Sequence, residues 1–201
     1  MSLVTCDAGI SVDGYTAGPN QSLEHPMGEG TEQLHRWMFE QPEQNTAARE
    51  AILDAGAFIM GRNMFGPIRG EWQGDQADAW RGWWGEEPPY HAPVFVLTHY
   101  AREPIVMEGG TTFYFVTDGV RSAMEQARAA SGDRAVSIGG GADTVRQFLR
   151  AGLIDELRLH IAPLVLGAGE RLFEGMQGLR LEQIEATSSE LVTHVRYRVL
   201  H

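Results

Sequence analysis

Short runs of apolar residues alternate along this chain with longer stretches in which apolar residues recur every three or four positions. The short runs predict strands and the longer stretches predict helices. Strands are expected at residues 3–8, 57–60, 94–98, 111–116, 135–138 and 156–161, and helices at residues 31–40, 46–55, 120–130 and 143–151. This alternation predicts an α/β fold with a central, mostly parallel twisted sheet flanked by helices.

The last quarter of the chain shows little helical periodicity. Residues 164–166 and the Gly167-Ala168-Gly169 turn lead into further apolar stretches at residues 179–186 and 191–200. We expect these late segments to pair as antiparallel strands. The chain contains no linker, repeat or low-complexity segment, so residues 1–201 are predicted to form one domain.

Residues 67–93 follow neither pattern and are rich in Trp, Gly and Pro. The segment carries Trp72, Trp80, Trp83 and Trp84. Irregular segments of this length inside a domain are usually functional or mobile. We therefore expect it to act as a lid beside a bound substrate, although these tryptophans also suit core packing or a subunit interface.

Composition narrows the classes of function. The chain is 43% apolar and 21% charged, which is typical of a globular protein. Its 27 acidic and 16 basic residues give a net charge of −11, so a nucleic-acid partner is not expected. No apolar run is long enough for a membrane helix, and the N-terminus shows no secretory signal, so we expect a cytoplasmic protein. The single cysteine, Cys6, excludes an intrachain disulfide and fits a buried position in the first strand.

Two other enzyme classes lack their motifs. A serine hydrolase needs a Gly two residues before its nucleophile, but Ala135 precedes Ser137. A metalloenzyme needs clustered ligands, and the seven histidines are scattered singly, so no metal site is predicted.

Three predicted strand ends carry residues suited to a phosphorylated ligand. Gly139, Gly140 and Gly141 form a turn from a strand into a helix, where backbone N–H groups and the helix dipole favour an anion. A plain tight turn is the alternative, because Thr144 stands where the dinucleotide fingerprint has its third glycine.

The other two strand ends carry polar side chains. Gly61, Arg62 and Asn63 follow one strand, and Leu97 and Thr98 close another, with Arg102 within reach. Arginine suits a ribose 2′-phosphate because its planar fork of donors matches the phosphate oxygens. Taken alone, Arg62 equally fits a solvated surface position.

These residues resemble a known family. Residues 11–19 (SVDGYTAGP), the Met60-Gly61-Arg62-Asn63 element, and a run from Ile138-Gly139-Gly140-Gly141 through residues 152–157 (GLIDEL) to Gly167-Ala168-Gly169 carry the resemblance. The chain is similar to the dihydrofolate-reductase-like superfamily, and most to the reductase domain of the bacterial bifunctional deaminase-reductase of riboflavin biosynthesis. Met64 stands where dihydrofolate reductases usually have a threonine.

The resemblance implies NADPH as hydride donor and a small heterocyclic substrate, of the 5-amino-6-(5-phosphoribosylamino)uracil or pterin kind. Gly139, Gly140, Gly141 and Thr144 would hold the pyrophosphate. Gly61, Arg62 and Asn63, with Leu97 and Thr98, would hold the adenosine end. Asp13, Gly14 and Tyr15 would lie near the nicotinamide. The resemblance also implies a homodimer.

Candidates for the chemistry follow from this arrangement. Asp13 is expected to orient substrate or relay a proton, although an Asp before Gly also suits a turn. His35, Trp37 and Trp72 are expected to contact the substrate. A binding module of the same fold, without turnover, stays open as the alternative.

Overall fold

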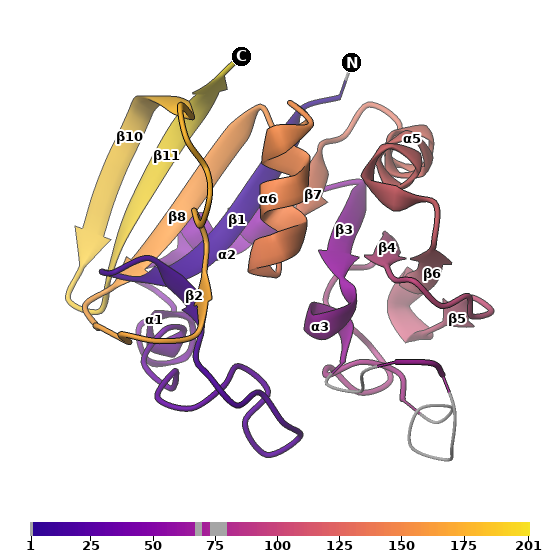
Figure 1. The fold of residues 1–201 in the computed structure, drawn as a ribbon, viewed down its shortest axis with the longest axis horizontal. Helices are drawn as coiled ribbons and strands as arrows, with labels where there is room; N and C mark the ends of the chain where they lie inside the picture. Colours follow the sequence, from indigo (N-terminus) through magenta and orange to yellow (C-terminus); the bar gives the residue numbers. More distant parts are fainter. Residues whose placement is uncertain (1, 67–69, 73–79) are drawn as a thin grey trace.

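The structure, a computed structural model, describes residues 2–66, 70–72 and 80–201 of the chain. Nine strands of the described residues form one sheet (Figure 1). In spatial order they are β10 (Arg180–Ser189), β11 (Val192–Leu200), β8 (Glu156–Ala162), β1 (Val4–Ser11), β7 (Val136–Ile138), β3 (Ala57–Gly61), β4 (Pro93–Leu97), β6 (Thr112–Val116) and β5 (Ile105–Val106).

The sheet confirms the predicted fold class. Strands β8, β1, β7, β3, β4 and β6 are mutually parallel, so their carboxyl ends share one edge of the sheet. The late strands β11 and β10 add antiparallel to β8, as predicted, and the short β5 adds antiparallel to β6 at the other end.

Helices cover both faces of the sheet. Helices α5 (Gly119–Ser131) and α6 (Ala142–Arg150) lie on one face (Figure 1). They pack there through side chains such as Met124 and Phe148, which share a core with Cys6 and Ile138. The opposite face carries α1 (Arg36–Glu40) and α2 (Thr46–Leu53) over β1, β8 and β11. Among the described residues, no helix is long and apolar enough to cross a membrane.

The helix predicted at residues 31–40 is only partly present, because α1 begins at Arg36. Thr31 instead turns the chain: its Oγ1 donates to Gly28 O at 2.6 Å, and the Leu34 N–H donates to Thr31 O at 2.9 Å. Leu34 and Trp37 are still fully buried, as their spacing predicts. The turns before α1 therefore bury the same apolar side chains that a continuous helix over residues 31–40 would have buried.

Other differences concern very short elements. Strand β2 (Tyr15–Ala17) pairs with β9 (Glu170–Arg171), and α3 (Arg62–Phe65) follows β3 directly. Two or three residues are too few to show a period, so the sequence predicts neither β2 nor β9. Residues 164–166 form no strand; the Val12 N–H donates to Leu164 O at 2.8 Å instead.

The Trp-rich segment forms a second core where the structure describes it. Residues 70–72 and 80–92 contain no helix or strand, as predicted. Trp80 donates from Nε1 to Phe65 O at 2.9 Å, and Trp72 and Trp80 pack against a cluster around Phe58, Phe65 and Phe113. Residues 67–69 and 73–79 of the predicted lid lie outside the described residues.

Candidate active site

The three strand ends singled out in the sequence are neighbours in space. Strand β3 lies between β7 and β4, and all three run parallel. The glycine turn after β7, Arg62 after β3 and Thr98 after β4 therefore stand side by side at the carboxyl edge, where open α/β sheets bind ligands.

The glycine turn is fastened to the end of β3 by backbone hydrogen bonds. The Gly61 N–H donates to Gly140 O at 2.7 Å, and the Gly139 N–H donates to Ile59 O at 2.9 Å. Gly140 has φ +115°, which side chains rarely allow, and the Gly140–Gly141 peptide bond is cis. The two backbone hydrogen bonds thus join two predicted cofactor-binding elements into one continuous surface.

The last glycine of the turn faces open space. A Cβ added at Gly141 would meet no atom within 4 Å, and Gly141 is the N-cap of the nine-residue helix α6. Asp143 does not occupy this space, because its carboxylate accepts from Gln147 Nε2 at 2.6 Å along the helix flank. The opening in front of α6 therefore combines free room with the positive end of a helix dipole, which suits a pyrophosphate.

Two side chains wall the turn. Thr144 is buried and packs so closely on Gly61 that no Cβ would fit between them. Met64 lies over Gly139, where an added Cβ would come 3.0 Å from its Cε. The position that carries threonine in dihydrofolate reductases here supplies an apolar cover for the glycine turn.

Arg62 contacts two side chains just beyond the end of β3. Its Nη1 donates to Thr98 Oγ1 at 3.3 Å, and its Cζ lies 3.0 Å from the centroid of the Trp72 ring. Arg102 approaches the same ring, with Cζ 4.7 Å from the centroid. Asn63 is exposed, and Leu97 is partly buried at the end of β4.

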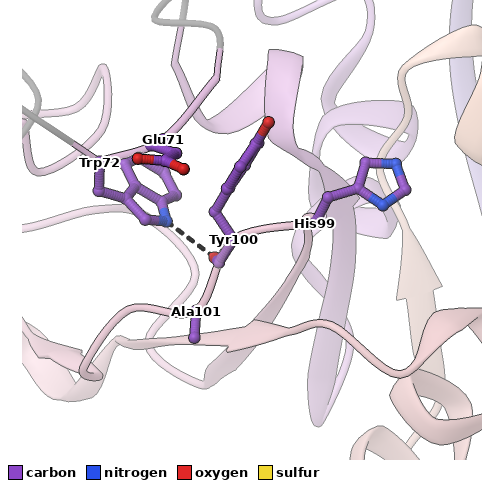
Figure 2. Close-up of a pocket in the computed structure, with 5 residues that line it drawn as sticks. All are labelled: Glu71, Trp72, His99, Tyr100 and Ala101. Atoms are coloured by element: carbon purple, nitrogen blue, oxygen red, sulfur yellow. Dashed lines mark hydrogen bonds between the residues drawn. The ribbon is translucent and has the colours of Figure 1, made fainter.

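A shallow pocket of about 350 Å³ adjoins this arginine pair. Its lining consists of Glu71, Trp72, His99, Tyr100 and Ala101. Figure 2 shows the Trp72 and Tyr100 rings next to each other, with the Trp72 Nε1–H donating to Tyr100 O at 2.9 Å, while the His99 ring points away. Trp72 packs against Arg62, and its predicted contact with the substrate stays a prediction.

Asp13 fastens the loop after β1 to a later segment. Its carboxylate accepts from the Leu166 N–H at 3.1 Å, the Gly167 N–H at 2.7 Å and Ser11 Oγ at 2.6 Å. The bond from Ser11 and these amides lower the pKa of Asp13 to about 2. With its oxygens so engaged, the carboxylate fits a loop anchor, and the predicted proton relay stays untested.

Gly14 and Tyr15 continue the same loop. Gly14 has φ +87° and its carbonyl accepts from the Leu172 N–H at 2.9 Å, while the Tyr15 hydroxyl donates to Gly167 O at 3.4 Å. These contacts bring residues 166–172 beside the end of β1. Their predicted contact with the nicotinamide stays a prediction.

His35 and Trp37 lie on the other side of β1 from α6. The His35 ring covers Gly9, where an added Cβ would come 2.9 Å from Nε2. Burial, and secondarily the charge of His160, lower the pKa of His35 to about 4. Trp37 is fully buried against the His160 and His194 rings at 5.0 and 4.7 Å, so its ring offers no surface to a ligand in this conformation.

His160, His194 and Asp7, which sequence reasoning did not single out, complete this side. Each is an isolated polar residue within a strand, and only strand pairing brings them together. In the described residues no group of three or more His, Cys, Asp or Glu side chains has the geometry of a metal site.

The sheet order, with its parallel centre and antiparallel late strands, defines a dihydrofolate-reductase-like fold. More narrowly, the chain belongs to the RibD C-terminal domain family, whose model matches residues 2–193. The resemblance seen in the sequence is therefore confirmed.

Individual relatives are distant. The chain is 22% identical over 202 residues to "Uncharacterized protein YyaP" of Bacillus subtilis (strain 168), covering 96% of this chain and 93% of that protein. The structure of a "Putative riboflavin biosynthesis protein" from Shewanella sp. PV-4 has a TM-score of 0.68 at 22% identity, with 99% of both chains covered. Dihydrofolate reductase from Enterococcus faecalis, complexed with NADP(H) and RAB-propyl, has a TM-score of 0.57 at 13% identity, covering 98% of this chain and 96% of that one.

Proposed function

We propose that this protein is an NADPH-dependent reductase that transfers hydride to a small heterocyclic substrate of the pyrimidine or pterin kind. The observation that carries the proposal is the adjacency of the Gly139–Gly141 turn, Arg62 and Thr98 on three neighbouring strand ends. Membership of the RibD C-terminal domain family and the likeness to an NADP(H)-bound dihydrofolate reductase support it.

The residues fit the cofactor at both ends. The space in front of Gly141, at the start of α6, suits a pyrophosphate, because a glycine there leaves the backbone N–H groups accessible. Arg62 and Thr98 together offer donors for a 2′-phosphate, and Arg102 adds a second positive charge beside the same ring. These local donors offset the repulsion of a chain with net charge −11.

The reduced nicotinamide would supply the hydride. The protein would position the cofactor and the substrate, exclude water from the site and supply a proton. The Asp13 loop, which follows β1, is fixed to residues 166 and 167 by their backbone N–H groups. A substrate bound there would lie near His35, which covers Gly9 of β1. We further propose a cytoplasmic homodimer, as in the family that the sequence resembles.

Titration of the pure protein with NADPH and NADH, followed by cofactor fluorescence, tests the proposal. Arg62→Ala removes charge-assisted hydrogen bonds worth about 1.5–3 kcal/mol, so NADPH affinity should fall about 10- to 150-fold. NADH, which lacks the 2′-phosphate, should lose little. The matched control is Arg180→Ala, an exposed arginine of β10 at the opposite edge of the sheet.

If Arg62→Ala lost the same affinity for NADPH as for NADH, Arg62 would not bind the 2′-phosphate. Absence of binding for both cofactors in the folded wild type would refute the reductase. Tight binding of NADPH without oxidation over a panel of pterins and pyrimidines would favour a binding module without turnover.

A further inference from the structure

The pocket beside Trp72 is lined by residues outside the motifs that carry the family resemblance. Its lining comes from residues 71–72, in the Trp-rich segment, and from residues 99–101, just after β4. None of these positions belongs to the strand-loop, Gly-Arg or glycine-turn motifs. The role of the pocket therefore follows from the chemistry of its own side chains.

Thr98 links this pocket to the donors proposed for the 2′-phosphate. Its Oγ1 accepts from Arg62 Nη1 at 3.3 Å and from the Tyr100 N–H at 3.2 Å. A hydroxyl group that accepts two hydrogen bonds still has its own proton to donate. The Thr98 hydroxyl and the Arg62 guanidinium can therefore bind one phosphate together, and the backbone of Tyr100 is fixed directly beside them.

Two aromatic side chains stand in the pocket next to these donors. The Trp72 Nε1–H donates to Tyr100 O at 2.9 Å, which ties the indole to the segment that carries the Tyr100 ring (Figure 2). The Trp72 ring already contacts the guanidinium groups of Arg62 and Arg102. Tyr100 is 38% exposed, whereas Trp72 is only partly exposed, so Tyr100 offers the more accessible aromatic surface.

A nucleotide base suits this position. In a dinucleotide with a 2′-phosphate, that phosphate and the base are attached to neighbouring carbons of one ribose. The groups that bind the base must therefore lie close to those that bind the phosphate, and Tyr100 is two residues from Thr98. The pocket, of about 350 Å³, has room for a flat bicyclic base, and bases stack readily on aromatic side chains.

Glu71 gives the pocket a preference among purine bases. It carries the only carboxylate among the described residues that line the pocket. A carboxylate accepts hydrogen bonds and donates none. Adenine presents a 6-amino donor at its edge, whereas hypoxanthine presents a carbonyl oxygen there, which a carboxylate would repel. The charges of Arg62 and Arg102 beside Trp72 offset the repulsion between Glu71 and the phosphate.

We infer that Tyr100 stacks on the adenine ring of the cofactor, that Trp72 forms the neighbouring wall, and that Glu71 selects adenine by accepting from its 6-amino group. This inference rests on the proposed function and adds the base to the phosphate contacts of Arg62 and Thr98. NADPH and NADH carry the same base, so Tyr100 and Glu71 should act on both cofactors equally. Arg62, in contrast, should act on NADPH alone.

Tyr100→Ala tests the stacking by calorimetric titration with NADPH and NADH. We expect both affinities to fall by the same factor, about 5- to 150-fold, the equivalent of about 1–3 kcal/mol. Tyr100→Phe should keep most of the affinity, because it keeps the ring. Phe39→Ala, which removes a 70% exposed ring from α1, is the control for the loss of a surface aromatic side chain.

The outcomes separate the inference from the proposed function. Wild-type affinity for both cofactors in Tyr100→Ala would overturn the stacking and leave the reductase standing. A loss for NADPH alone would also overturn it, because Tyr100 would then act only through Thr98 on the phosphate. If the folded wild type bound neither cofactor, the proposed function itself would be refuted.

The base preference is tested with NADH and its hypoxanthine analogue, first on the wild type and therefore without any risk of misfolding. We expect the analogue to bind about 2- to 13-fold more weakly, the effect of one hydrogen bond. Glu71→Gln should reduce this preference, because an amide both donates and accepts. Glu50→Gln removes the same charge at an exposed position of α2 and should keep it. Equal binding of the two dinucleotides to the wild type, or an unchanged preference in Glu71→Gln, would overturn the role of Glu71.

Discussion

Gly61 and Thr144 pack against each other so closely that no side chain fits between the end of β3 and the start of α6. A Cβ at Gly61 would fall far inside van der Waals distance of Thr144 Oγ1, and Thr144 is buried. We predict that Gly61→Ala lowers the free energy of unfolding by about 1–3 kcal/mol, the usual cost of overpacking. Urea unfolding measures this loss. The double variant Gly61→Ala/Thr144→Ala should regain part of it, and strictly additive losses would argue against the contact.

Gly141→Ala should weaken NADPH binding while leaving the stability of the protein almost unchanged. The added methyl group meets no atom of the protein within 4 Å and the residue has φ −70°, so stability should change little. The same methyl group would enter the space assigned to the pyrophosphate. We expect NADPH affinity to fall about 5- to 150-fold, the equivalent of an overpacking cost of 1–3 kcal/mol. Calorimetric titration beside an unfolding curve separates the two effects; unaltered affinity would place the pyrophosphate elsewhere.

The sequence predicts this part of the site well because its signals are local. Strand β3 is buried along its whole length and therefore appears as an unbroken apolar run, and three successive glycines mark the turn after β7. Parallel pairing then brings the two together. Asp7 and His160 are 153 residues apart, and an isolated polar residue in a strand gives no sign of its partner. Likewise, no local pattern indicates that Trp72 lies on Arg62 rather than beside the substrate.

Trp72 should affect the cofactor more than the fold of the sheet. Its ring packs against the guanidinium of Arg62, so we expect Trp72→Leu to weaken NADPH binding about 2- to 30-fold, the range of a cation–π contact of 0.5–2 kcal/mol. NADH binding should change less. Trp84→Leu, at an exposed tryptophan, is the control. Tighter binding of NADPH would instead mean that the ring competes with the phosphate for Arg62.

Asp13→Asn tests the loop anchor. An amide has one acceptor oxygen, so at least one of the Leu166 and Gly167 N–H groups should lose its acceptor or its geometry. We expect faster hydrogen exchange at these two amides, with α5 unaffected. Because the pKa of Asp13 is lowered to about 2, its stabilising effect should be present above about pH 4 and be lost as the pH falls toward 2. Exchange rates equal to those of the wild type would show that the carboxylate does not hold the segment.

Two partly buried histidines, His35 and His194, should make the protein less stable in mild acid. Burial, followed by the charge of His160, lowers the pKa of His35 and of His194 to about 4, whereas unfolded histidine titrates near 6.5. Between these values the unfolded chain binds more protons than the native one. The free energy of unfolding should therefore fall as the pH drops from about 6.5 to 4 and should be level just above that window.

His35→Gln measures how much of this pH dependence of the free energy of unfolding comes from His35. A single proton contributes a slope of at most about 1.4 kcal/mol per pH unit, so the variant should show a flatter dependence between about pH 7 and pH 5 than the wild type. Urea unfolding at several pH values measures the slope, and His201→Gln controls for an exposed ring. If the slope of His35→Gln equals that of the wild type, His35 is already protonated in the native state.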